Sequence, residues 1–360
     1  MIRIDEIYNH TLWPWIRDHR PGTRMFFCDP FGHTGPEHLY NFGREFDETG
    51  YVFCHDQEPI QLDSHRLLFE LVWEKNAYLP NFDGTVIVSE LGENVEKLYH
   101  KYSWKSRYYF FHGWACLDWY RGYDRTFLFP RFGERIVPSH TFMSPNRIIG
   151  GERDHRVLFL YHVMRHGLEH NYVSAPHVCP VEHQDITTVA KRYCNRYPDI
   201  MQVLEQAQLP WLFQDEPTQL MSSCWLGNFA EAMDSLIYVP TETVYFGRRT
   251  HITEKTFKAI ALGMPFILVA TAGSLEYLRS YGFQTFHDVW NESYDEETDD
   301  FRRLEQVTDL LASIDACSPR EREQIWRHTR PAVEHNWHHF YRGGFESVLW
   351  PELTGMLNGL

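Results

Sequence analysis

The stretch Ile237-Tyr238-Val239-Pro240-Thr241-Glu242-Thr243, continued by Arg248-Arg249-Thr250-His251-Ile252-Thr253-Glu254-Lys255-Thr256-Phe257-Lys258-Ala259-Ile260-Ala261-Leu262-Gly263-Met264-Pro265-Phe266-Ile267-Leu268-Val269, decides the fold class that we expect. Its first apolar run predicts a strand, and Thr253 is placed to cap a helix whose apolar residues recur at helical spacing. Gly263 and Pro265 end that helix, and residues 266–269 predict a second buried strand. The stretch therefore predicts a strand–helix–strand unit of an α/β protein, with parallel strands joined right-handedly.

Charged side chains crowd the predicted start of this helix. A helix N-terminus carries a partial positive charge and unpaired N–H groups, so it suits a phosphate. Cations here would bind phosphate, while the Glu254 carboxylate could accept hydrogen bonds from ribose hydroxyls. The candidate nucleotide-binding residues are Glu242, Arg248, Arg249, His251, Thr253, Glu254 and Lys255. The alternative is that Glu254 and Lys255 are ordinary first-turn charges on a solvated helix face.

The segment from Thr253 to Pro265 reads Thr-Glu-Lys-x-Phe-x-Ala-x-x-x-Gly-x-Pro. It resembles the donor-binding motif of alpha-1,3-fucosyltransferases and related GT-B glycosyltransferases, and residues 236–290 also resemble uncharacterised phage and bacterial proteins of that type. The resemblance is short. It implies that Glu254 and Lys255 hold the ribose and diphosphate of a nucleotide sugar, such as a UDP- or GDP-sugar, with no further cofactor.

The same resemblance implies the GT-B architecture, in which two Rossmann-like domains face a cleft and C-terminal helices cross back to the first domain. We expect an acceptor-side domain over residues 1–150, with residues 145–153 as the linker. A nucleotide-sugar-binding domain would follow over 151–330, and a helix over 331–360 would return to the first domain. The sequence also predicts helices over residues 301–314, 319–336 and 344–358. In such enzymes the first loop of the second domain often supplies a cation to the phosphates. A predicted strand at 156–161 makes Arg165 that candidate.

Polar residues follow another predicted strand at residues 51–54, where the sequence reads His55-Asp56-Gln57-Glu58-Pro59. Glu58-Pro59 resembles the Glu-containing, Pro-adjacent loop of the fucosyltransferases. Glu58, with Asp56 second, is therefore the candidate general base that takes the acceptor hydroxyl proton, which would invert the anomeric carbon. Without such a base, retention becomes the expectation. The alternative is a polar loop that caps the next helix, as loops commonly do.

Two further groups of residues have two interpretations each. Asp29 and His33, in the Gly/Pro-rich loop after a predicted strand at 24–28, would either contact substrate or shape a turn. An aromatic and polar group would suit an acceptor sugar or base, or would simply pack in the core. That group follows a strand predicted over 108–114 and consists of Trp114, Asp118, Trp119, Tyr120 and Arg121.

The net charge of the chain bears on the class of acceptor that we expect. The chain has 360 residues and a formal net charge of −15, which argues against a broad duplex-binding face because such a face must neutralise phosphates. We therefore expect a glycan, protein or small-molecule acceptor. A DNA glycosyltransferase acting on hydroxymethylated bases stays an alternative, as does a non-catalytic nucleotide-binding protein. No Gly-x-Gly-x-x-Gly follows the first predicted strand, which argues against a dinucleotide-dependent dehydrogenase.

Cysteine and histidine usage bears on compartment and metal. The seven cysteines are scattered without a CxxC pair, and no apolar run approaches the roughly 18 residues that span a bilayer. We expect a cytoplasmic protein of a bacterium or a phage-infected cell. His166, His170, His177, Cys179 and His183 match no zinc-binding spacing, so we expect no metal site.

Overall fold

The computed structural model describes residues 8–19, 24–28, 39–40, 52–56, 59–60, 82–102, 105–125, 138–213 and 225–359. The chain divides into two compact units. The first consists of Met1–Trp119, Arg248–His251 and Glu346–Leu360, and the second of Tyr120–Gly247 and Ile252–Phe345. The unit boundary near residue 120 differs from the predicted domain boundary at 150, and residues 145–153 lie inside the second unit.

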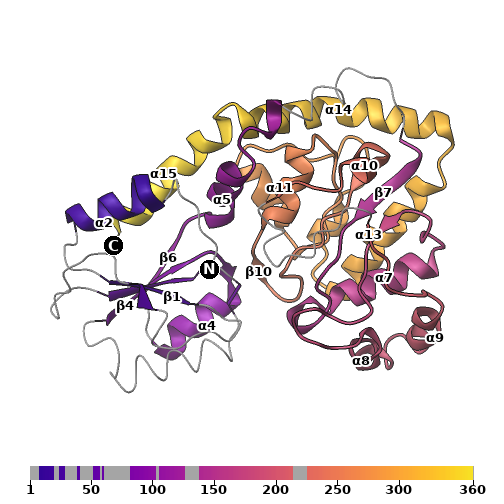
Figure 1. Cartoon of the computed structure of the whole chain (residues 1–360), viewed down its shortest axis with the longest axis horizontal. Coiled ribbons are helices and arrows are strands. Elements are labelled where there is room, and N and C mark those ends of the chain that lie inside the picture. Colours follow the sequence, from indigo (N-terminus) through magenta and orange to yellow (C-terminus); the bar gives the residue numbers. More distant parts are fainter. Residues whose placement is uncertain are drawn as a thin grey trace. The chain divides into compact units, whose positions relative to one another are not determined.

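A mostly parallel sheet forms the centre of the first unit (Figure 1). Its strand order is β2 (Leu39–Tyr40), β1 (Arg24–Cys28), β3 (Val52–Asp56), β4 (Phe82–Val88) and β6 (Lys105–Tyr108). Within this sheet, the described pairing of β2 with β1 is antiparallel and the other described pairings are parallel. Residues 86–88 at the end of β4 are apolar and almost fully buried, which is the pattern of a parallel strand covered on both faces. The strand predicted at 24–28 is confirmed as β1, and the strand predicted at 51–54 is confirmed from Val52 onward as β3.

Helices accompany this sheet. They are η1 (Tyr8–Leu12), α2 (Trp13–His19), α4 (Glu93–Tyr102), α5 (Phe111–Trp119) and α15 (Gly344–Asn358). The prediction of a strand over 108–114 was wrong beyond Tyr108, because Phe111 begins α5. The first six residues of α5 are all buried. A helix buried on every side shows no apolar periodicity, so its sequence cannot be told from a buried strand.

The segment Arg248–His251 joins the first unit through a short antiparallel pair. Within it, β10 (Arg249–Thr250) pairs with β5 (Leu91–Gly92), so that Arg249 lies opposite Gly92. Gly92 has a φ of +118°, and a Cβ atom there would lie 2.3 Å from the Arg248 carbonyl oxygen. Glycine is therefore required for this close approach of the two backbones.

The second unit contains the predicted strand–helix–strand stretch. Its sheet has the order β8 (Tyr172–Val173), β7 (His140–Ser144) and β9 (Ser235–Tyr238), all parallel. Residues 266–269 lie parallel on the far side of β9, through the bridges Tyr238–Phe266 and Thr241–Val269. Between them runs α11 (Glu254–Ala261), which Thr253 caps, and Gly263 takes a φ of +63° just after it. The strand–helix–strand prediction is confirmed.

The prediction of a strand over 156–161 was wrong, since these residues lie in the helix α7 (His155–Arg165). Residues 155–163 are all buried, so the apolar run again carries no helical period. The strand that starts this sheet is β7, earlier in the chain. The residues after β7, and not those after 161, therefore form the first loop at the carboxyl edge of the sheet.

The other helices of the second unit surround this sheet, several of them labelled in Figure 1. They are η4 (Tyr123–Arg125), η5 (Gly151–Arg153), α8 (Ile186–Ala190), η6 (Lys191–Tyr193), α9 (Ile200–Glu205), α10 (Phe229–Met233), α12 (Ser274–Ser280), η8 (Ser293–Glu296), α13 (Asp300–Asp315) and α14 (Pro319–Tyr341). Helices predicted at 301–314, 319–336 and 344–358 are confirmed as α13, α14 and α15. None of the helices in the described part of the chain is long and apolar enough to cross a membrane.

Candidate functional site

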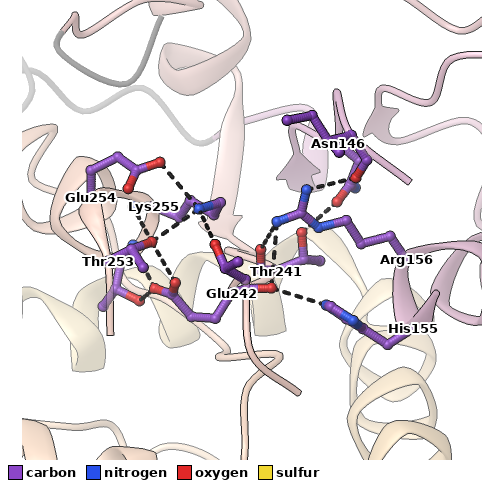
Figure 2. Close-up of polar contacts among 11 residues, drawn as sticks. Asn146, His155, Arg156, Thr241, Glu242, Thr253, Glu254 and Lys255 are labelled. Atoms are coloured by element: carbon purple, nitrogen blue, oxygen red, sulfur yellow. Dashed lines mark hydrogen bonds and ion pairs between the residues drawn. The ribbon is translucent and has the colours of Figure 1, made fainter. Parts of the chain in front are cut away.

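The topology of the second sheet selects one edge for a ligand. From β7 the chain passes through α7 to β8 on one side, whereas β9 is followed by α11 and residues 266–269 on the other side. The strand order thus reverses between β7 and β9. Open α/β sheets bind ligands outside the carboxyl ends of the strands at such a switch point. The loops after β7 and β9 meet there in a polar network, which Figure 2 shows.

Glu242 accepts hydrogen bonds from the N-terminus of α11. Its side chain is fully buried and accepts hydrogen bonds from the Thr253 hydroxyl (2.5 Å), the Thr256 hydroxyl (2.6 Å) and the Thr256 N–H (3.3 Å). A carboxylate placed against the N-terminus of a helix is stabilised by the helix dipole. The backbone N–H of Lys255 points to the Thr253 hydroxyl at 3.5 Å. Donors that were predicted to meet a phosphate are thus already occupied by Thr253 and Glu242.

Lys255 is the cation of this network with solvent access. Its side chain is 24% exposed. The Nζ atom donates to the Thr243 hydroxyl (2.9 Å), the Thr253 hydroxyl (3.0 Å) and Glu254 Oε1 (3.1 Å). An anion that approaches Lys255 would replace one of these neutral or carboxylate acceptors, because an ammonium has only three N–H donors.

Arg156 and His155 complete the network, and sequence reasoning missed both (Figure 2). Arg156 donates to the carbonyl oxygens of Ile148 (2.7 Å) and Thr241 (2.8 Å), which lie on the two loops of the switch point. Burial lowers the pKa of Arg156 to about 9, which still leaves the guanidinium charged at neutral pH. His155 Nε2 lies 3.0 Å from the Glu242 carbonyl oxygen, and burial lowers the His155 pKa, so the ring is neutral. The misassigned strand at 156–161 concealed these two residues.

Asn146 links the same two loops. Its Nδ2 donates to the Ser144 carbonyl oxygen (3.2 Å), and its Oδ1 accepts from the Thr241 hydroxyl. With Ser144 on β7 and Thr241 after β9, these bonds hold the two carboxyl ends in register. The position of Asn146 two residues after a strand could have signalled this role, had β7 been recognised.

Four of the predicted binding residues do not belong to this network. Arg248, Arg249 and His251 lie in the first unit, where Arg249 forms a buried ion pair with Glu90 and His251 Nδ1 lies 3.1 Å from the Ser89 carbonyl oxygen. Arg165 lies about 13 Å along α7 from Arg156, as nine residues of α-helix require. There it pairs with Asp199 at 2.5 Å. The structure therefore brings together Glu242, Thr253, Glu254 and Lys255 of the predicted set.

A second loop-to-helix start, at residues 271–276, is also occupied by protein. Asp295 accepts hydrogen bonds from the Leu275 N–H (3.1 Å) and the Glu276 N–H (3.4 Å) at the N-terminus of α12. Gly273, with a φ of +80°, is the N-cap residue of α12, and Ser274 is its first helical residue. The N-terminal donors of α12 thus bind a carboxylate of the chain itself.

The predicted catalytic residues are only partly described. Glu58, like Asp29 and His33, lies outside the described residues. Asp56 is the last residue of β3, at the carboxyl edge of the first sheet. Trp114 is 7% exposed and Tyr120 is fully buried, so these two rings pack in the core.

Three histidines of the group at residues 166–183 each pair with a different aspartate. His166 pairs with Asp309 (3.2 Å), His170 with Asp315 (3.2 Å) and His177 with Asp185 (2.9 Å). Within the described part of the chain, no three His, Cys, Asp or Glu side chains come together as a metal site would require.

Comparisons with known proteins are sparse. No family model matches the chain, and no curated protein matches it. A solved structure described as "OtsA apo structure" is similar with a TM-score of 0.39 and 12% sequence identity, over 82% of this chain and 67% of that chain. A score at that level is too low to assign the fold or an activity.

Proposed function

We propose that this protein is a glycosyltransferase that moves a sugar from a nucleotide sugar to an acceptor hydroxyl. The observation that carries the proposal is the location of the Thr253–Glu254–Lys255 helix tip at the switch point of a parallel sheet, where α/β proteins bind nucleotides. The short resemblance to the fucosyltransferase donor motif falls on the same three residues. Two Rossmann-like domains that face a cleft, as in GT-B enzymes, are part of the proposal.

The proposed chemistry assigns one task to each charged side chain. Lys255 stabilises the diphosphate that leaves with the nucleotide, and a fixed cation of this kind favours the charge that develops in the transition state. Glu254 accepts hydrogen bonds from the ribose hydroxyls. Glu58, or in second place Asp56, removes the proton of the acceptor hydroxyl, so that the reaction inverts the anomeric carbon. This scheme uses no metal ion, and a UDP- or GDP-sugar is the expected donor.

The net charge of −15 favours a glycan, a protein or a small molecule as the acceptor. Hydroxymethylated DNA is the less favoured acceptor, because the negative net charge of the chain opposes the binding of a duplex. A second candidate function is nucleotide binding without catalysis. The switch-point network supports that function equally, since it needs no general base.

A thermal-shift screen against UDP-, GDP-, ADP- and CMP-sugars tests the donor site. A ligand at 100 times its Kd stabilises the native state by about 2.7 kcal/mol, which raises the unfolding midpoint. Lys255→Met and Glu254→Ala should each abolish the shift. Lys258→Met, one turn further along α11, is the matched control and should retain it. A shift that survives in both site variants would remove α11 from the donor site.

Transfer is tested separately from binding. With the donor found in the screen, Glu58→Gln should bind it normally but release no product with an acceptor. Donor hydrolysis or transfer by the wild-type protein separates an enzyme from a mere binder. Full turnover by Glu58→Gln would exclude Glu58 as the base, and Asp56→Asn would then be tested in the same assay.

A further inference from the structure

We propose that Arg303 is a positioning residue, which fixes the loop of residues 241–247 at the candidate site. Through that loop it places the Thr243 hydroxyl, to which Lys255 donates a hydrogen bond. All of these residues belong to the second unit. The effect on ligand binding rests on the proposed function, whereas the anchoring of the loop does not. Arg303 itself does not contact the donor in this proposal.

The Arg303 side chain binds three separate segments of backbone. It lies near the start of α13 and is 2% exposed. Its Nε donates to the Ala270 carbonyl oxygen (2.9 Å), and its terminal nitrogens donate to the carbonyl oxygens of Glu297 (2.8 Å) and Tyr245 (2.8 Å). The nitrogen that binds Tyr245 also donates to Asp300 Oδ1 (2.6 Å). Because a guanidinium holds its donors in a rigid planar fork, this one side chain fixes the distances between the three segments.

Two of these segments leave neighbouring strands at the same edge of the second sheet. Residues 241–247 follow β9, and Ala270 follows the stretch 266–269, which lies parallel to β9. Arg303 therefore links the carboxyl ends of two neighbouring strands. Arg156 does the same for the loops after β7 and β9. The loop after β9 is thus bound by a buried arginine from each of two helices.

Tyr245 is bound through its ring and its hydroxyl as well as its carbonyl oxygen. The Arg303 guanidinium carbon lies 4.6 Å from the ring centroid, and the His155 ring stacks on Tyr245 at 4.7 Å with an interplanar angle of 14°. The Tyr245 hydroxyl donates to the Asp300 carbonyl oxygen (2.7 Å), and the Gly247 N–H donates to Asp300 Oδ2 (3.2 Å). A buried cation is attracted to the face of an aromatic ring, so Arg303 holds Tyr245 by more than its hydrogen bond.

Thr243 lies between two anchored residues of this loop. On one side, the Glu242 carbonyl oxygen lies 3.0 Å from His155 Nε2. On the other side, Tyr245 is two residues away, a span of about 7 Å at most. A displacement of Tyr245 would therefore reach Thr243 through a single intervening residue.

The position of Thr243 matters for the cation of the candidate site. The Lys255 ammonium donates to three acceptors, which are Thr243, Thr253 and Glu254. In the proposed function Glu254 binds ribose, which leaves one Lys255 donor for phosphate and two on the threonine hydroxyls. Without a fixed Thr243 hydroxyl, the lysine side chain would have to be ordered when the ligand binds, and that ordering costs affinity.

The first test compares Arg303→Lys with the wild-type full chain in the absence of ligand. Lysine keeps the charge but cannot bind three carbonyl groups with a planar fork. Hydrogen exchange should rise in peptides covering residues 241–247 and stay unchanged in peptides from α8 and α9. Arg327→Lys, which alters the exposed pair with Glu323 on α14, is the matched control and should leave all of these peptides unchanged.

The second test is a double-mutant cycle in the affinity for UDP, GDP or ADP, whichever gives the largest thermal shift. Arg303→Lys and Thr243→Val should each weaken binding about tenfold, which corresponds to about 1.4 kcal/mol. The double variant should also lose about tenfold rather than about a hundredfold, because both substitutions remove the same contact. A residue that only stabilises the fold would give additive losses.

Unchanged exchange at residues 241–247 in a folded Arg303→Lys protein would overturn the proposal. A uniform rise across all peptides, or additive losses of affinity, would overturn it as well. If Arg303→Lys does not fold, Asp300→Asn, which alters the carboxylate partner of Arg303, decides by the same two measurements. Absence of binding of all three nucleotides by the wild type would contradict the proposed function alone, since the exchange measurement needs no ligand.

Discussion

At the scale of single residues, buried charged groups organise the candidate site more than exposed cations do. The sequence suggests a basic phosphate pocket, yet Glu242 lies beneath the α11 tip and Arg249 is enclosed with Glu90. Charges in the interior need partners, because an isolated ion loses its hydration there. Arg156 meets this need with carbonyl oxygens of two loops, and thereby links them.

Glu242→Gln should destabilise the protein by about 1–3 kcal/mol, the usual cost of leaving a buried polar group without its partner. The amide nitrogen would face a threonine hydroxyl or the Thr256 N–H where a carboxylate oxygen now accepts. Urea unfolding measures the change. Glu334→Gln, on the surface of α14, should stay within about 0.5 kcal/mol of the wild type. Equal midpoints for both variants would show that Glu242 does not support the helix tip.

Asp295 should make stability fall as pH rises. Burial raises the pKa of Asp295 to about 6 in the native state, above the value of about 3.9 in an unfolded chain. The native state therefore holds the proton more tightly, so this contribution is present below about pH 4 and lost as pH rises through about 6. Two pKa units correspond to about 2.7 kcal/mol.

The measurement is urea unfolding of the wild type and of Asp295→Asn at pH 4 and pH 7.5. Relative to the variant, the wild type should lose about 2–3 kcal/mol between these two pH values, by the same conversion. The comparison cancels the titration of the other carboxyl groups. A difference that does not depend on pH would contradict the raised pKa.

At the scale of elements, capping residues identify helices better than apolar runs do. Helices α13 and α14 begin after Asp299 and Ser318, whose side chains accept from first-turn N–H groups. Both were predicted within two residues of their observed starts. By contrast, α5 and α7 are buried along most of their length and have no side-chain N-cap that the structure describes. Their apolar runs were taken for strands because burial on all sides removes the helical period.

Ser318→Ala should weaken α14 by about 1 kcal/mol, the usual contribution of an N-cap side chain. Ser318 and Glu321 form a reciprocal capping box, with the Ser318 N–H donating to Glu321 Oε2 at 2.7 Å. Guanidinium unfolding followed by circular dichroism measures the loss. Ser313→Ala inside α13 is the control, because its hydroxyl donates to the Leu310 carbonyl oxygen of the same helix and caps no helix end. If the two substitutions had the same effect, the box would not stabilise α14.

At the scale of the whole molecule, the two compact units are interleaved along the chain. The first unit consists of residues 1–119, 248–251 and 346–360. Pairing of residues 91–92 with 249–250 therefore closes a loop of more than 150 residues. Contacts at such separation are set by the folded structure, since closing the loop costs entropy that only many simultaneous contacts offset.

Gly92→Ala should destabilise the protein by more than about 2 kcal/mol, because backbone strain at positive φ adds to a clash with the Arg248 carbonyl oxygen. Gly122→Ala is the matched control. Its φ is +85° with open space around a Cβ atom, so only the strain, about 1 kcal/mol, should appear. Denaturant midpoints give both values. Similar losses for the two variants would mean that the β5–β10 pair tolerates the extra methyl group.

The sequence by itself determined the α/β class, the strand–helix–strand unit around α11 and the terminal helices, because these depend on local caps, glycines and apolar periods. It also placed Thr253, Glu254 and Lys255 at a helix tip. Only the tertiary structure decided that Arg156, His155 and Asn146 belong to the polar network at that tip. It also decided that Arg249 pairs with Glu90 instead. The reason is physical: a buried charge takes whichever partner the packed chain brings within hydrogen-bonding distance, and that partner can lie far away in the sequence.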